Sequence, residues 1–330
     1  MAGDSRPVLV APDSFKGTLD SREVAEAIGK GLADRGLEVD LMPIADGGEG
    51  TLGVLLDALG GETVEVHAHD ALGRPVAAQI GLNVGEPGTA VVETAQAIGL
   101  PLVAEADRDP EAATSRGAGE LIAAAAARGA TRIVVAVGGS ATTDGGAGAI
   151  EAIEEAGGLG DAKLTVCCDA QTPFEEAARV FGPQKGADPA AVARLSERLA
   201  GQAASLPRDP TGLPMTGAAG GLAGGLWATY GAQLVGGAGF VLDALDADRR
   251  MRASRGVVVG EGRLDRTTLE GKAVGELAVR ARQAGVPAHA VVGEDALDLL
   301  DRRILDLHAV IEARDPKALR AAGRTLAEYL

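Results

Sequence analysis

The chain has 330 residues, with 31 Lys and Arg against 47 Asp and Glu and a formal net charge of −16. This length is about twice that of a typical domain, so it predicts one protein with two lobes and a sizeable core. The acidic balance, with no stretch that concentrates basic residues, argues against nucleic acid as a partner.

Glycine is abundant and aromatic residues are scarce: there are 48 Gly, but four Phe, two Tyr and one Trp. A core of Ala, Val, Leu and Ile with many glycine turns is therefore expected. The segment Met1–Pro7 lacks the basic-then-apolar order of a signal peptide. The two cysteines, Cys167 and Cys168, are adjacent, which disfavours a disulfide between them. We expect a cytoplasmic protein with reduced cysteines.

The first 60 residues alternate between strand and helix patterns. An apolar run at Val8–Val10 predicts a buried strand. Asp20, with Glu23 three residues later, predicts the start of a helix that ends at Gly36. A second strand is expected at 39–44, and a second helix over 52–59. This order is typical of a parallel α/β sheet.

The middle of the chain has a different pattern, which begins with an expected antiparallel hairpin over 63–82. The segment Thr211–Leu242 carries no charge but contains many glycines, so we expect a buried Gly-Ala helix there rather than a membrane span. The other elements expected here are strands at 90–92, 133–137 and 163–168 and helices at 119–130 and 189–204.

Helix–strand alternation returns near the C-terminus. Strands are expected at 257–259, 286–292 and 304–310, with a helix at 271–284 and another at the end of the chain. We predict that these three strands join the two N-terminal ones in a single parallel sheet. Residues 1–60 and 241–330 then form a flavodoxin-like α/β domain, and residues 61–240 form an inserted mixed α/β domain.

Four expected strand ends carry similar loops, which combine glycine with charged residues, at 13–17, 46–50, 138–146 and 260–265. Ligands bind beyond the carboxyl ends of strands in open α/β sheets. Glycine lets backbone N–H groups approach an anion, Lys or Arg neutralises phosphate, and carboxylates hold Mg²⁺. The loops therefore indicate a metal-bound polyphosphate ligand. The P-loop, dinucleotide and protein-kinase signatures are absent from the sequence.

Six segments together resemble the glycerate kinase family. They are Ala-Pro-Asp-Ser-Phe-Lys-Gly at 11–17, Ala-Asp-Gly-Gly-Glu-Gly at 45–50, Gly-Gly-Ser-Ala-Thr with Asp-Gly-Gly at 138–146, Phe-Gly-Pro-Gln-Lys-Gly-Ala at 181–187, Gly-Ala-Ala-Gly-Gly-Leu at 217–222 and Gly-Glu-Gly-Arg-Leu-Asp at 260–265. The resemblance implies phosphorylation of D-glycerate with ATP and Mg²⁺, with 2-phosphoglycerate favoured over 3-phosphoglycerate as product. It also implies the two-domain fold, with the site in its cleft.

The chain departs from the family pattern at Thr143, where the family usually has Asn, and over 170–176. These departures leave two alternatives open: a kinase of another small hydroxy acid, and a sensor that binds a nucleotide or acid without catalysis. The expected ligands are small molecules, with no nucleic acid and no membrane. A homodimer is compatible with the sequence.

Loop position and residue type select the candidate site residues. The aspartates are candidates for a base or a metal ligand, and Asp46 is the candidate ligand of Mg²⁺. For Asp13 and Asp46, a helix cap or an Asx turn is the structural alternative. Arg263 can clamp a carboxylate or form an internal ion pair with Asp265 or Glu261. The catalytic candidates are Asp13, Lys16, Asp46, Asp144 and Asp169. The candidates for substrate or phosphate binding are Ser14, Gly47, Gly48, Glu49, Gly138, Gly139, Ser140, Thr142, Lys185, Glu261, Arg263, Asp265 and Lys272.

Overall fold

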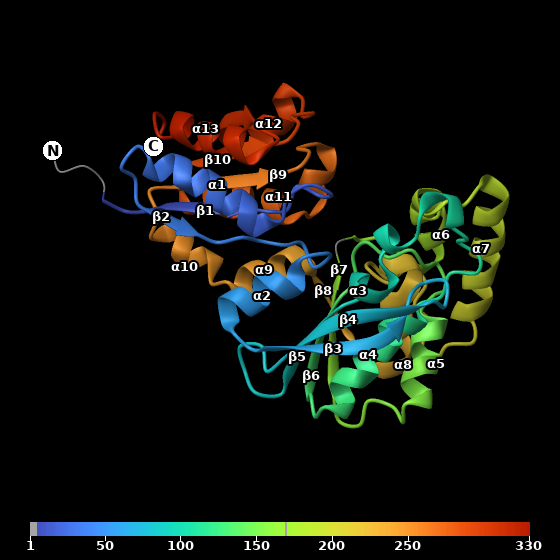
Figure 1. The fold of residues 1–330 in the computed structure, drawn as a ribbon. Helices are drawn as coiled ribbons and strands as arrows, with labels where there is room; N and C mark the ends of the chain where they lie inside the picture. Colours follow the sequence, from blue (N-terminus) through green and yellow to red (C-terminus); the bar gives the residue numbers. More distant parts are fainter. Residues whose placement is uncertain (1–4, 169) are drawn as a thin grey trace. The chain divides into compact units, whose positions relative to one another are not determined.

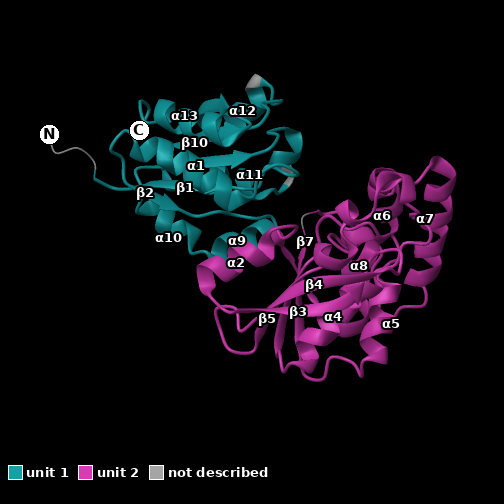
Figure 2. Cartoon of the chain, in the orientation of Figure 1, with its two compact units in different colours: residues 1–46, 238–330 teal, residues 47–237 magenta. Residues whose placement is uncertain are grey.

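The computed structural model describes residues 5–168 and 170–330, which form an α/β protein (Figure 1). The chain divides into two compact units (Figure 2). Unit 1 comprises Met1–Asp46 and Ala238–Leu330, and unit 2 comprises Gly47–Gly237. Both ends of the chain therefore contribute to unit 1, and unit 2 is inserted between them.

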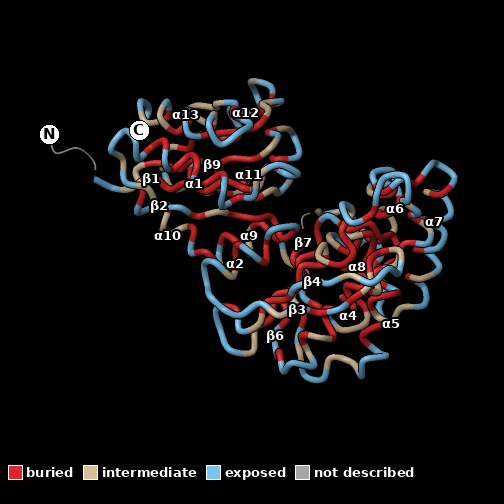
Figure 3. The backbone as a smooth tube through the Cα atoms, in the orientation of Figure 1, coloured by how far each residue is buried: buried red, intermediate tan, exposed pale blue. Residues whose placement is uncertain are grey.

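Unit 1 is built on a five-stranded sheet in the order β11-β10-β9-β1-β2, in which all neighbours are parallel. This is the flavodoxin-like strand order, so the predicted sheet formed by both termini is confirmed. Its central strands are buried along their whole length (Figure 3), as expected for a sheet covered on both faces. The strands are β1 (Val8–Pro12), β2 (Val39–Leu41), β9 (Gly256–Glu261), β10 (Ala288–Val292) and β11 (Leu307–Glu312).

Three helices of unit 1 start at a capping aspartate. Asp20 and Glu23 form the predicted capping box at the start of α1. Glycines let α1 and α13 pack closely, since a Cβ on Gly31 would lie 2.1 Å from the Arg320 carbonyl oxygen. The helices are α1 (Ser21–Ala33), α9 (Gly237–Ala244), α10 (Ala247–Arg252), α11 (Ala273–Ala284), α12 (Leu299–Leu305) and α13 (Pro316–Leu326).

Unit 2 contains a six-stranded mixed sheet in the order β3-β4-β5-β6-β7-β8. The predicted hairpin is confirmed as the antiparallel pair of β3 and β4, while β5 to β8 run parallel. The strands are β3 (Glu62–His69), β4 (Pro75–Leu82), β5 (Thr89–Glu93), β6 (Arg132–Ala136), β7 (Lys163–Cys168) and β8 (Gln233–Gly236). The helices are α2 (Thr51–Leu59), α3 (Ala95–Ile98), α4 (Arg116–Ala127), α5 (Ala147–Glu155), α6 (Ala177–Phe181), α7 (Pro189–Ala203) and α8 (Leu222–Tyr230).

The buried Gly-Ala helix predicted in the uncharged segment 211–242 is present as α8, but it occupies only part of the segment. The segment also contains the strand β8 and the start of α9. Ala219, Gly220 and Gly221 have φ values of 52°, 67° and 92°, a left-handed backbone that cannot continue a helix. No helix in the described part of the chain is both long and apolar enough to cross a membrane.

The first boundary between the units lies at Asp46, whereas we expected it at residue 60. The intervening helix α2 packs on β4 and β5 of unit 2 through its buried apolar residues. A strand–helix pattern does not show which sheet a helix covers, so the sequence could not assign α2. The second boundary, at Gly237, lies close to the expected residue 240.

We expect Gly31→Ala to destabilise unit 1 by about 1–3 kcal/mol, the usual cost of forcing a methyl group into a packed interface. The added Cβ would collide with the backbone of α13. Gly239→Ala is the matched control in the same unit, because its nearest new contact is the Arg280 guanidinium at 3.6 Å. Urea unfolding measures both variants, and equal stabilities would refute the close helix contact.

Candidate functional site in unit 1

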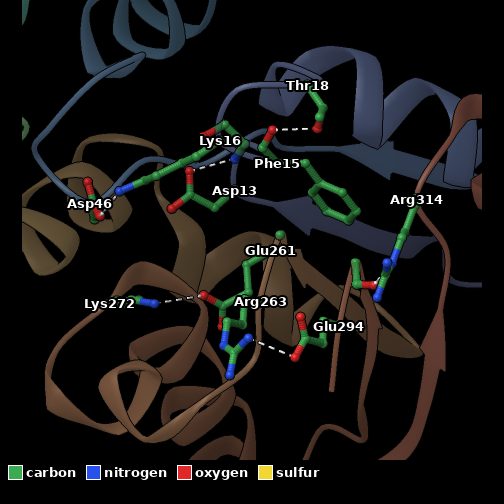
Figure 4. A pocket seen from close by; sticks show the side chains of 13 residues that line it. Asp13, Phe15, Lys16, Thr18, Asp46, Glu261, Arg263, Lys272, Glu294 and Arg314 are labelled. Atoms are coloured by element: carbon green, nitrogen blue, oxygen red, sulfur yellow. Dashed lines mark hydrogen bonds and ion pairs between the residues drawn. The ribbon is translucent and has the colours of Figure 1, made fainter. Parts of the chain in front are cut away.

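A pocket lies at the carboxyl edge of the unit 1 sheet and has a volume of about 380 Å³ (Figure 4). Residues that follow all five strands line it, so the chain converges here from both of its ends. The lining residues are Asp13, Ser14, Phe15, Lys16, Thr18, Asp46, Glu261, Gly262, Arg263, Lys272, Gly293, Glu294 and Arg314. The volume falls within the usual range for small-molecule sites.

The pocket has this position because of the strand order. From β1 the chain crosses over to β2 on one side, and from β9 it crosses over to β10 on the other, so β1 and β9 flank the topological switch point. The N–H of Asp13 donates a hydrogen bond of 2.8 Å to the Gly260 carbonyl and holds the loop after β1 against β9. Asp13 and Glu261 therefore meet at the point where this type of sheet leaves a crevice.

Asp13 and Asp46 place two buried carboxylates beside each other in the pocket. Burial, with the neighbouring Asp46 charge, raises the pKa of Asp13 to about 7, although the Ser14 N–H donates to its Oδ1 at 2.6 Å and opposes the shift. Lys16 Nζ lies 3.7 Å from Asp46 Oδ2. Near neutral pH, Asp13 is thus suited to exchange a proton with a ligand.

Glu261, at the end of β9, is the third buried carboxylate of the pocket. It accepts a hydrogen bond of 2.6 Å from the Thr268 hydroxyl and lies 3.3 Å from Lys272 Nζ. Burial raises the pKa of Glu261, and the Lys272 ammonium partly opposes that shift. Glu261 and Lys272 were separate candidates in the sequence, and the structure brings them together as an ion pair.

Arg263 forms the internal ion pairs that sequence analysis left as its structural alternative. Its Nε donates to Asp265 at 3.3 Å and its Nη1 to Glu294 at 2.7 Å, so Asp265 is a partner as expected but Glu261 is not. Asp265 also caps the turn that follows, where it accepts from the Thr267 N–H. The guanidinium is more than half exposed and lines the pocket, so it remains available to a ligand.

The side chains of the pocket are suited to a magnesium ion that binds together with a polyphosphate. Among residues 5–168 and 170–330, no group of three or more His, Cys, Asp or Glu side chains is placed to hold a metal. Mg²⁺ at phosphate-transfer sites usually takes one or two carboxylates, with water and phosphate oxygens as its other ligands. Asp46, beside Asp13, provides such a carboxylate pair.

A second polar group gathers in unit 2, in the loop after β6 and the turn Pro183–Lys185. Lys185 is buried, with its Nζ donating to the Thr142 carbonyl and lying 3.3 Å from the Ser140 hydroxyl. Within residues 5–168 and 170–330, the buried Thr142 and Thr143 hydroxyls have no hydrogen-bond partner. Buried hydroxyls normally find partners, so this group is poised to receive an anionic or polar ligand.

Asp144 accepts hydrogen bonds from three backbone N–H groups of unit 2. Its Oδ2 accepts from the N–H and hydroxyl of Ser115 at 2.7 and 2.8 Å and from the Gly148 N–H at 3.2 Å, while Oδ1 accepts from the Gly146 N–H. The first amides of α5 are therefore occupied by this carboxylate. A negative charge is favourable at the start of a helix, so Asp144 serves as a structural cap of α5.

The remaining candidates are distributed as follows. Gly138 and Gly139 begin the loop of unit 2 after β6, and Gly139 has a left-handed φ of 76°. Gly47 and Gly48 are buried in the turn before α2, while Glu49 is exposed. Ser14 lines the pocket of unit 1. Asp169 lies outside the described residues.

Six residues that line the pocket are not among the sequence candidates. Phe15, Thr18 and Gly262 lie close in sequence to candidates, and the other three are Gly293, Glu294 and Arg314. These last three follow β10 and β11, two strands that we had predicted in the same sheet. Because all carboxyl ends of a parallel sheet face one edge, that prediction already implied that these loops reach the site. The signal was missed because the loops lack the glycine-acid clusters of the other strand ends.

The pocket lies at the strand ends of a flavodoxin-like sheet and contains buried carboxylates and cations. These features place the protein in the class of α/β enzymes that act on small anionic ligands. Comparison with known proteins identifies the family. A profile of the glycerate kinase family matches residues 8–157 and 155–329. The chain belongs to the glycerate kinase family and is a kinase.

Individual relatives agree with this assignment. A glycerate kinase of Halalkalibacterium halodurans is 35% identical over 97% of both chains. The glycerate 2-kinase of Escherichia coli is 35% identical, over 87% of this chain and 84% of the relative. A crystal structure of a Salmonella typhimurium LT2 protein assigned as glycerate kinase 2 superposes with a TM-score of 0.83 and 32% identity, covering 99% and 98% of the two chains.

We expect Asp13→Asn to stabilise the protein at pH 8. The pKa of Asp13 is higher in the folded than in the unfolded chain, so ionisation of this group lowers the free energy of unfolding by up to about 1.4 kcal/mol per pH unit between pH 4 and 7. The stabilising effect of the substitution should be large at pH 8 and vanish near pH 4.

Thermal unfolding from pH 4 to 8 measures this effect. Asp306→Asn is the control, because Asp306 is exposed in the same unit and its left-handed backbone also suits Asn. An Asp13→Asn variant whose stability relative to wild type does not change with pH would show that Asp13 ionises as it does in water.

Proposed function

We propose that this kinase transfers the γ-phosphoryl group of ATP to the 2-hydroxyl of D-glycerate, giving 2-phosphoglycerate and ADP. The Asp13–Asp46 carboxylate pair at the switch point, with Lys16 beside it, is the observation that supports this proposal most strongly. The E. coli relative is a glycerate 2-kinase, which favours the 2-hydroxyl. Assignment to glycerate kinases alone does not distinguish the two hydroxyls.

Asp13 is the proposed general base. The glycerate hydroxyl gives its proton to the Asp13 carboxylate as its oxygen forms a bond to the γ-phosphorus, and the bond from that phosphorus to ADP breaks. A base with a pKa near the working pH is efficient, because it is substantially ionised and still basic enough to accept a proton. Burial beside Asp46 gives Asp13 this property.

Asp46 is the proposed ligand of Mg²⁺. When bound with ATP, the ion would neutralise the negative charge that phosphoryl transfer spreads over the phosphate oxygens. Lys16 is held next to Asp46 at 3.7 Å, so its ammonium group is placed to contact the transferred phosphoryl group. Lys272 and Arg263 each pair with a carboxylate of the pocket and contribute positive charge to its wall.

The polar group of unit 2 is assigned to anion binding within the same function. Lys185, Ser140 and Thr142 present an ammonium and hydroxyl groups to one place. This combination suits a carboxylate or phosphate, whose oxygens accept several hydrogen bonds at once. We further propose that the enzyme works in the cytoplasm, where its two buried cysteines would stay reduced.

A coupled assay of ADP release with purified protein, ATP, Mg²⁺ and D-glycerate tests the activity, and phosphorus NMR identifies the product. The proposal expects glycerate to be the best acceptor in a panel of small hydroxy acids, with 2-phosphoglycerate as product. A better acceptor in that panel would replace glycerate. ATP binding without transfer to any acceptor would identify the chain as a sensor.

We expect the acidic limb of the pH profile of kcat/KM for MgATP to have an apparent pKa of about 7 in the wild type. Since Asp46 raises the pKa of Asp13, Asp46→Asn should move this limb to lower pH in addition to reducing the rate. Excess Mg²⁺ keeps the ionisation of ATP the same in both measurements. A limb that does not move would show that Asp13 is not the titrating group.

A further inference from the structure

Arg314 lines the pocket of unit 1 but belongs to none of the loops that sequence analysis selected. It follows β11, where the Ala313 N–H continues the sheet pairing through a 2.8 Å bond to the Val292 carbonyl. Its Nε donates to the Gly293 carbonyl at 2.7 Å, which anchors one edge of the guanidinium. Figure 4 shows Arg314 on the side of the pocket opposite Lys16 and Asp46.

The other cations of the pocket are paired with carboxylates. Lys16 pairs with Asp46, Lys272 with Glu261, and Arg263 with Glu294. Within the described residues, Arg314 has no carboxylate at ion-pair distance, and its one hydrogen bond goes to a neutral carbonyl. Arg314 is exposed, and both of its Nη groups remain able to donate. A guanidinium anchored in this way is suited to hold two oxygens of an anion at once.

The position of Arg314 distinguishes between the two substrates. Asp13 follows β1 and Arg314 follows β11, three strands apart in the sheet. At about 4.8 Å per strand, this separation is about 14 Å. The Arg314 side chain extends toward Gly293 by about one strand spacing. Its guanidinium is therefore roughly 10 Å from Asp13. A nucleoside triphosphate spans this distance with phosphate oxygens along its length, whereas glycerate carries its carboxylate directly beside the 2-hydroxyl that contacts Asp13.

We propose that Arg314 binds the polyphosphate of the nucleoside triphosphate donor, on the side away from the transferred phosphoryl group. The triphosphate then lies along the carboxyl edge of the sheet, from Lys16 and Asp46 toward Arg314. This inference rests on the proposed function for the location of the reacting hydroxyl at Asp13. It adds a donor-binding residue from the last strand of the sheet.

Steady-state kinetics of Arg314→Ala and Arg314→Lys test the proposal. We expect Arg314→Ala to raise KM for ATP about tenfold or more, with kcat and KM for glycerate within twofold of wild type. Arg314→Lys keeps the charge but not the planar fork, so its KM for ATP should be intermediate. Arg252→Ala is the control, because Arg252 is an exposed arginine of the same unit that does not line the pocket.

Calorimetry with inorganic triphosphate and Mg²⁺ separates this proposal from the proposed function, because it requires no turnover. Arg314→Ala should weaken triphosphate binding by the same factor as ATP binding. A wild-type chain that binds triphosphate but does not phosphorylate glycerate would refute the proposed function. The binding of triphosphate by Arg314 would still be tested by calorimetry. The inference about Arg314 would be overturned by unchanged constants for ATP and triphosphate, by a rise in KM for glycerate instead, or by a wild-type chain that binds no triphosphate.

Discussion

The chemistry of this protein depends on two carboxylates that are held together where most water is excluded. Asp13 and Asp46 would repel each other less in water, and the fold keeps them in place through backbone contacts such as that between the Asp13 N–H and the Gly260 carbonyl. That arrangement costs folding free energy, which the buried apolar strands around it offset. A strained electrostatic arrangement supported by a well-packed scaffold is common at functional sites.

Much of unit 1 could be predicted from the sequence because its signals are local. Buried apolar runs mark the strands, Asp20 and Glu23 mark a helix start, and glycine-acid clusters mark three of the loops at the pocket. Arg314 was missed although its strand was predicted in the sheet, because the loop after β11 carries no glycine-acid cluster. The role of Asp144 as a cap could not be predicted, since its partner Ser115 lies 29 residues earlier in the chain.

The glycines serve two physical purposes that composition alone cannot separate. Some permit close packing: a Cβ on Gly220 would lie 2.0 Å from the Thr142 carbonyl oxygen, and one on Gly31 would meet α13. Others, such as Gly139, adopt left-handed φ in loops at strand ends without any close neighbour. The abundance of glycine therefore reflects tight helix contacts as well as turns near ligands, and the low aromatic content is consistent with an interior of small side chains.

The pairing of β1 with β9 has a consequence for how the protein is made. During synthesis β1 and β2 leave the ribosome first, but the strands that complete their sheet come from the last third of the chain. Unit 2 is a continuous segment and is fully synthesised before those strands, so it can fold while the N-terminal strands still lack their neighbours. The pocket that joins Asp13 to Glu261 and Arg314 is therefore assembled last, and a chain truncated before β9 cannot form it.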